Sequence, residues 1–127
     1  MKILHTTRLK TTSHQEAFDL VTTHLFTQGV QAKNGMMCVN LTRSGLMCAG
    51  GALMKHPGRV NQAIKTAVLD GKVKTKLLPE FLDSLRAVHD NYLNWDVVNH
   101  QFVGGNALRS VAERYWLDSS IVDAFDR

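Results

Sequence analysis

Helix-starting and helix-ending residues bracket most of the apolar patterns in this 127-residue chain, and they restrict its fold more than any other feature. Ser13 and Glu16 form a capping box, in which each side chain can accept a hydrogen bond from the backbone N–H of the other residue. Apolar residues then recur at helical spacing as far as Gln28, and Gly29 is a natural helix stop. The pattern predicts a helix over residues 14–28.

Other helix-starting and helix-ending residues follow along the chain. A short helix is expected over residues 49–55. It should end there, because Pro57 disfavours helix in the residue before it. A second apolar pattern runs from Val60 to a stop at Gly71. Pro79 is typical of the first position of a helix, and this one is predicted to extend to about residue 93. A further helix is expected from Asn106 onward, with a last short turn over residues 120–123.

One short β-hairpin completes the predicted fold. Residues 36–41 are expected to form a strand and residues 42–45 a turn. Residues 46–48 then return as a second strand or lead into the short helix. The predicted class is a small α+β domain of four to five helices packed around the hairpin. It spans residues 1–127, with residues 1–12 as an N-terminal extended segment and residues 118–127 as a C-terminal tail.

Length and composition point to one globular domain outside the membrane. Apolar residues make up 44% of the chain, an ordinary value for a globular protein, and no apolar run approaches the roughly 18–20 residues of a membrane helix. The first residues lack the apolar stretch of a secretion signal. Two cysteines and five methionines suit a reducing compartment. We therefore expect a cytoplasmic protein with no membrane partner.

Charge is divided unevenly along the sequence. Residues 1–76 carry eleven Lys and Arg against three Asp and Glu, for a net charge of +8, whereas residues 77–127 have a net charge of −4. Such a division favours contact with a nucleic acid or an acidic protein surface, although a solvated loop explains a lysine run equally well. Single-strand binders require aromatic residues among the basic ones, and this sequence has none interleaved with its basic residues. The candidate binding residues are Lys55, Arg59, Lys72, Lys74 and Lys76.

The two cysteines, Cys38 and Cys48, flank the predicted turn and provide the candidate reactive chemistry. A thiol just before a helix has its pKa lowered by the positive helix end, which would make Cys48 a candidate nucleophile. His89 is the candidate base. Asp90 is also a candidate catalytic residue, but adjacent helical residues point about 100° apart, so we do not expect it to orient His89.

Less reactive interpretations apply to the same residues. Free cysteines usually pack as small hydrophobes, and a histidine on an apolar helix face is usually buried and bonded to backbone. A disulfide between Cys38 and Cys48 would need a directly opposed pair in the hairpin. A zinc site would need four ligands, drawn from these cysteines with His56 and His89, and their spacing lacks the tight pairs of zinc knuckles. No metal or cofactor is therefore expected.

The chain resembles a family of small bacterial and phage proteins with a Cys-x9-Cys-Ala-x-Gly segment followed by a His-Asp helix. It departs from their pattern at Asn40, where they carry an aromatic residue, and at residues 55–59, which are basic where theirs are acidic. The resemblance implies the fold and a grouping of the cysteines with the His-Asp pair, and it transfers no activity. The matching residues are Cys38, Gly45, Cys48, Ala49, Gly51, Leu53, Leu82, Leu85, His89, Asp90, Trp95, Leu108, Ala112 and Leu117.

These observations favour a non-catalytic function. Because no complete catalytic motif is present and the resemblance includes phage proteins, we expect a small accessory protein that binds a host or phage protein and inhibits or redirects it. The resemblance implies that a phage encodes it. One alternative is a cysteine-dependent enzyme using Cys48 and His89. The other is a nucleic-acid-binding protein that uses the basic N-terminal portion. A homodimer remains open in each case.

Overall fold

The computed structural model describes residues 6–34 and 37–126. The predicted first helix is present as α1 (His14–Gln28). The Ser13 hydroxyl caps it by accepting a hydrogen bond from the backbone N–H of Glu16 (3.1 Å). Gly29 ends the helix in a left-handed conformation (φ 68°), which favours glycine.

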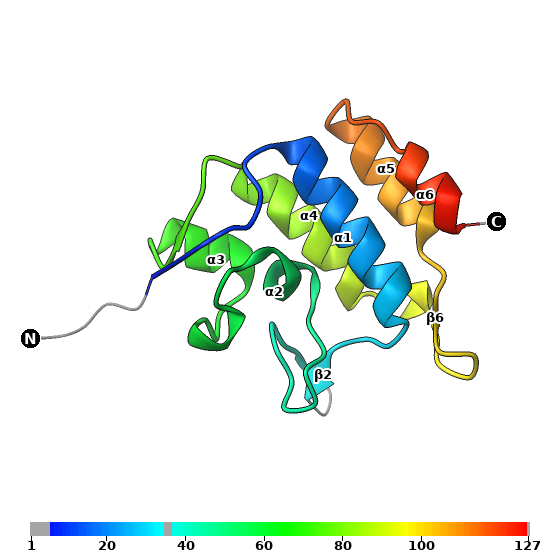
Figure 1. The fold of residues 1–127 in the computed structure, drawn as a ribbon, viewed down its shortest axis with the longest axis horizontal. Helices are drawn as coiled ribbons and strands as arrows, with labels where there is room; N and C mark the ends of the chain where they lie inside the picture. Colours follow the sequence, from blue (N-terminus) through cyan, green and yellow to red (C-terminus); the bar gives the residue numbers. More distant parts are fainter. Residues whose placement is uncertain (1–5, 35–36, 127) are drawn as a thin grey trace, which may run out of the picture.

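Two long helices form the centre of the molecule. α1 lies beside α4 (Pro79–Asp90), whose first residue is the expected proline. α2 (Ala49–Leu53) and α3 (Ile64–Leu69) cover one side of this pair, and α5 (Gly105–Arg114) and α6 (Ser120–Phe125) cover the other (Figure 1). The described part of the chain also contains two single 3-10 turns, η1 (Pro57–Arg59) and η2 (Tyr92–Asn94).

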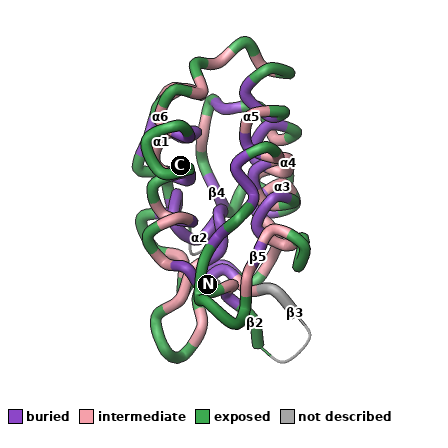
Figure 2. The backbone as a smooth tube through the Cα atoms, turned by 90° about the vertical axis from the view of Figure 1, so that its right-hand side faces the viewer, coloured by how far each residue is buried: buried purple, intermediate pink, exposed green. Residues whose placement is uncertain are grey.

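The core lies between these helices. Buried stretches line the inside of the bundle, whereas the peripheral turns are largely exposed (Figure 2). No helix in the described residues is long and apolar enough to cross a membrane. The largest fully buried apolar side chains are Phe18, Val21, Leu25, Leu53, Met54, Ile64, Val73, Phe81, Leu82, Leu85 and Leu108.

Strands make a minor contribution, in three separate pairs. β1 (Thr7–Arg8) runs parallel to β4 (Val73–Lys74), which joins two segments far apart in the sequence. The other pairs are antiparallel: β2 (Lys33–Asn34) with β3 (Met37–Cys38), and β5 (Trp95–Asp96) with β6 (Gln101–Phe102). The predicted class, a small helix-dominated α+β domain, is confirmed.

The chain reverses where the sequence predicted, but the strand partners differ. The Thr42 N–H donates to the Leu46 carbonyl (2.8 Å), and Leu41 and Met47 form an isolated antiparallel bridge. Residue 36 lies outside the described residues. Cys38 pairs with Lys33 and not with the returning segment. The return is short because Cys48 already caps α2, so only Met47 remains for pairing.

Candidate functional site

Cys48 occupies the N-cap of α2. Its Sγ accepts a hydrogen bond from the backbone N–H of Gly51 (3.4 Å) and donates to Oδ1 of Asn40 (3.2 Å). A Cβ at Gly51 would lie 1.9 Å from the Asn40 carbonyl oxygen, so glycine allows α2 to pack directly on this backbone. The thiol is thus enclosed, with only 3% of the residue exposed.

This enclosure reverses the expected acidity of the thiol. Burial, the largest effect, raises the pKa of Cys48 above its ordinary value, and the negative charge of Asp90 raises it further. The backbone N–H groups of Gly51 and Gly50 lower the pKa, but by less. The prediction of a lowered pKa is therefore wrong: a five-residue helix cannot offset the removal of water from a thiolate.

His89 is fully buried and both ring nitrogens are engaged. Nε2 accepts a hydrogen bond from the backbone N–H of Ala32 (3.0 Å), so the ring proton lies on Nδ1, which donates to Oδ1 of Asp90 (2.8 Å). The His89 carbonyl accepts from the Trp95 indole (2.8 Å). The prediction of a buried, backbone-bonded histidine is confirmed. The prediction that Asp90 does not orient it is wrong, because side-chain torsions close the 100° gap between adjacent residues.

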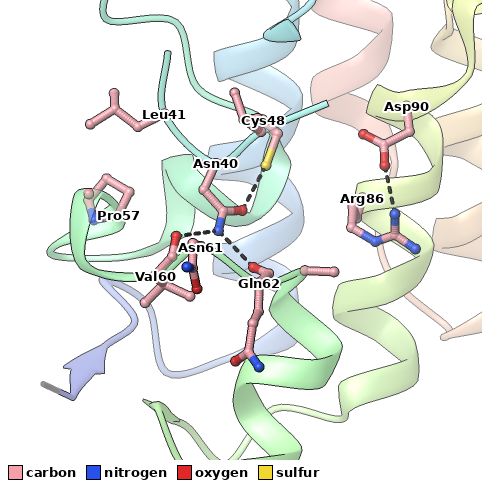
Figure 3. Close-up of a pocket in the computed structure, with 12 residues that line it drawn as sticks. Asn40, Leu41, Cys48, Pro57, Val60, Asn61, Gln62, Arg86 and Asp90 are labelled. Carbon is pink, nitrogen blue, oxygen red and sulfur yellow. Dashed lines mark hydrogen bonds and ion pairs between the residues drawn. The ribbon is translucent and has the colours of Figure 1, made fainter. Parts of the chain in front are cut away.

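A cavity of about 300 Å³ separates Cys48 from the Arg86–Asp90 ion pair (Figure 3). Asn40 lines one wall, and its Nδ2 donates to the carbonyls of Val60 (3.0 Å) and Gln62 (2.8 Å). Arg86 lines the other wall and binds Asp90 at 2.7 Å and Asp83 at 2.7 Å. The cavity thus brings Cys48 and Asp90 to facing walls, but the ring nitrogens of His89 are bonded to other groups.

The metal and disulfide hypotheses depend on Cys38. Its side chain lies outside what the structure describes, but Cys48 is a free thiol whose Sγ donates to Asn40, so the disulfide considered between Cys38 and Cys48 is not formed. Within residues 6–34 and 37–126, no three His, Cys, Asp or Glu side chains described there are close enough to hold a metal ion. His56 is exposed beside η1.

A second candidate site is a layer of three extended segments. β1 lies in the middle, with β4 on one side in parallel register, where Arg8 is opposite Lys74. On the other side is the segment that leaves α2, where Leu9 and Met54 form an antiparallel bridge. The Lys55 N–H donates to the Arg8 carbonyl (2.9 Å), so Arg8 lies between Lys74 and Lys55.

Side chains alternate across this layer as in any β-structure. Leu9, Met54 and Val73 are buried on the inner side. The residues between and beside them are exposed basic residues, and we term this outer surface the cationic face. It consists of Arg8, Lys10, Lys55, Lys72, Lys74 and Lys76, of which Lys10 also lines a groove with Asp19 and His24 of α1.

No ion pair within the described part of the chain involves the cationic face. The ion pairs found there centre on Arg86, Arg109 and His89, which lie on α4 and α5. Neighbouring strands are about 4.8 Å apart, and like charges that face each other across strands destabilise a sheet. The row formed by Lys55, Arg8 and Lys74 is therefore unfavourable in the free protein, because no ion pair in the described residues offsets the repulsion.

The structure brings together four of the five predicted binding residues, namely Lys55, Lys72, Lys74 and Lys76. The fifth, Arg59, is exposed in η1, outside the layer. Arg8 and Lys10 were missed as site residues. In the sequence, Arg8 and Lys10 flank the apolar Leu9, as in a strand with one buried face. That pattern does not identify the strands on either side.

Exposed apolar residues gather on a different part of the molecule, around β5 and β6. Among them, Val97 is 79% and Val98 is 87% exposed. We term this set, Tyr92, Leu93, Val97, Val98 and Val103, the apolar segment.

Comparisons with known proteins add no assignment. The chain matches no protein-family model, no curated protein and no solved structure. The resemblance to small phage proteins therefore stays a prediction. The geometry of the cavity and of the cationic face carries the functional argument.

Proposed function

We propose that this protein acts non-catalytically, by binding an anionic macromolecular partner through the cationic face. One observation carries the proposal: three segments remote in sequence place six basic side chains on one surface, with no ion pair to any of them in the described chain. An accessory protein that inhibits or redirects another molecule needs only such a complementary surface.

Charge repulsion supports this proposal. A row of like charges across strands costs stability in the free protein. An anionic partner would remove that cost on binding and would also speed association by electrostatic attraction. A surface that is unfavourable alone and favourable in a complex is typical of an interaction site.

The cavity gives little support to the alternative, a cysteine-dependent enzyme. A nucleophilic thiol needs a base or a lowered pKa. The Cys48 thiol instead donates to Asn40 and has a raised pKa, and both His89 nitrogens are bonded elsewhere.

Binding to heparin, a generic polyanion, tests the proposal. The wild-type protein is expected to bind at low salt, and Lys55→Glu/Lys72→Glu/Lys74→Glu is expected to lose at least tenfold in affinity. A matched control, Lys33→Glu/Arg43→Glu/Arg114→Glu, reverses three exposed charges outside the cationic face. It should bind within about threefold of wild type. Equal losses in both variants, or no wild-type binding, would refute the proposal.

A further inference from the structure

We infer that the partner of the cationic face is the phosphate backbone of a nucleic-acid duplex, bound without reading base sequence. This inference rests on the proposed function and specifies its partner. The alternatives are an acidic protein surface and a single strand, and three properties of the cationic face separate them.

The first property is spacing. Lys72 and Lys74 flank the buried Val73, and alternate residues of an extended chain are about 6.6 Å apart; Lys76 follows at a bend. Arg8 and Lys55 extend the array sideways at strand spacing. A duplex carries one charge per about 1.7 Å of its axis, so a run of about 10 Å, the two strand spacings from Lys55 across Arg8 to Lys74, presents about six phosphates. Six flexible basic side chains match that charge density.

The second property is residue type. Five of the six basic residues are lysines, which contact phosphates as point charges on flexible stems. Recognition of bases depends instead on bidentate Arg, Asn or Gln side chains. The cationic face has one arginine, Arg8, and its three segments, residues 7–10, 54–55 and 72–76, contain no Asn or Gln. This composition fits backbone contact, which positions a protein but carries no sequence information.

The third property is the lack of exposed apolar and aromatic groups. The large apolar side chains of the three segments, such as Leu9 and Met54, are buried. Protein interfaces have aromatic and apolar centres and are depleted in lysine, and single-strand sites need aromatic stacking platforms. The exposed aromatic residues of the described chain, Tyr92, Trp116 and Phe125, lie on other elements.

The test compares affinities of the full chain for five probes by fluorescence anisotropy at 50 and 200 mM salt. The probes are two DNA duplexes of unrelated sequence, an RNA duplex, a DNA single strand and poly-glutamate. Binding to a duplex of either nucleic acid, tighter than to the single strand and to poly-glutamate, is expected. The two DNA duplexes should agree within about threefold. With six phosphate contacts, log K should fall with a slope of about −5 against log salt, or about 10³-fold over this range.

Variants make the test specific to the cationic face. Lys74→Ala should reduce the magnitude of the salt slope by about 0.9, whereas Arg43→Ala should leave it unchanged, with circular dichroism confirming that both are folded. A tenfold preference between the two DNA duplexes would overturn the inference, as would tighter binding to the single strand. Binding to poly-glutamate and heparin but to none of the three duplexes would refute the duplex as partner and leave the proposed function standing. Binding to none of these probes would refute both.

Discussion

Single buried polar residues hold the parts of this molecule together. Asn40 is the clearest case, because its side chain bonds two carbonyls of the 60–62 segment and the thiol that caps α2. It is 8% exposed, so water cannot replace these bonds. An aromatic residue at this position would remove all three bonds.

Replacing Asn40 with alanine is therefore expected to destabilise the protein by about 2–3 kcal/mol, because two carbonyls and a thiol lose their partners in a buried place. Urea unfolding measures the change. Asn61→Ala is the matched control: Asn61 lines the same cavity but is exposed, and its replacement should cost less than about 0.5 kcal/mol. A cost for Asn40→Ala as small as that of the control would contradict the role assigned to its side chain.

The thiol of Cys48 gives a second prediction at this scale. Its pKa is raised in the folded state from an ordinary value of 9.0, so the unfolded chain releases the proton first as pH rises. The contribution of the thiol to stability is thus complete below pH 9 and is lost as pH rises toward the folded-state pKa. Between pH 7.5 and pH 10, the free energy of unfolding should fall less in Cys48→Ala than in the wild type. Equal losses would contradict the raised pKa.

Among the elements, β1 decides whether the cationic face exists. Its parallel pairing with β4 sets Arg8 against Lys74, and its other edge sets Arg8 against Lys55. The face is therefore a property of three paired segments, and neither the lysine run nor the N-terminal segment forms it alone.

Reversing one charge in this layer should separate stability from binding. In Lys74→Glu, an unfavourable cross-strand pair with Arg8 becomes a favourable one, worth about 0.2–1 kcal/mol. We expect a higher melting temperature together with weaker heparin binding. Arg43→Glu, in the exposed turn, should change neither. A lower melting temperature for Lys74→Glu would show that Arg8 and Lys74 do not repel each other in solution.

α1 also holds the reversal that precedes α2. Gln28 donates to the Met47 carbonyl (2.9 Å) and accepts from the Met47 N–H (2.8 Å), and His24 contacts the same carbonyl (2.7 Å). Gln28→Ala should therefore speed hydrogen exchange in residues 42–48 while α4 keeps its protection. Gln101→Ala, at an exposed position in β6, is the control. Unchanged exchange in residues 42–48 would mean that the reversal holds without α1.

Local signals predicted the helices, and long-range pairings account for what the sequence could not predict. The capping box at Ser13, the stop at Gly29 and the proline that begins α4 act within a few residues, so their effects can be recognised in the sequence. The burial of Cys48 depends on Asn40, and the engagement of His89 depends on Ala32, 57 residues away. No local pattern contains that information.

At the scale of the whole molecule, the two surfaces belong to elements at different ends. β1 lies toward one end of the long axis, and β6, which is flanked by the apolar segment, lies toward the other (Figure 1). A partner bound at the cationic face would leave the apolar segment uncovered.

The two ends should therefore respond independently to substitution. Val98→Asp changes a residue that is 87% exposed, so the melting temperature and heparin affinity should stay at wild-type values. Binding of an apolar dye should fall, because the exposed apolar area becomes smaller. Leu85→Asp, in the core, is the contrasting variant and should prevent folding. A loss of heparin binding in folded Val98→Asp would show that the two ends are coupled.

The position of β1 has a practical consequence for anyone who handles this protein. A run of histidines or acids attached just before β1 would lie beside Arg8 and would compete with, or imitate, the ligand being assayed. The carboxyl end emerges beyond α6, on the far side of the bundle (Figure 1). Affinity handles and fluorophores are best placed there.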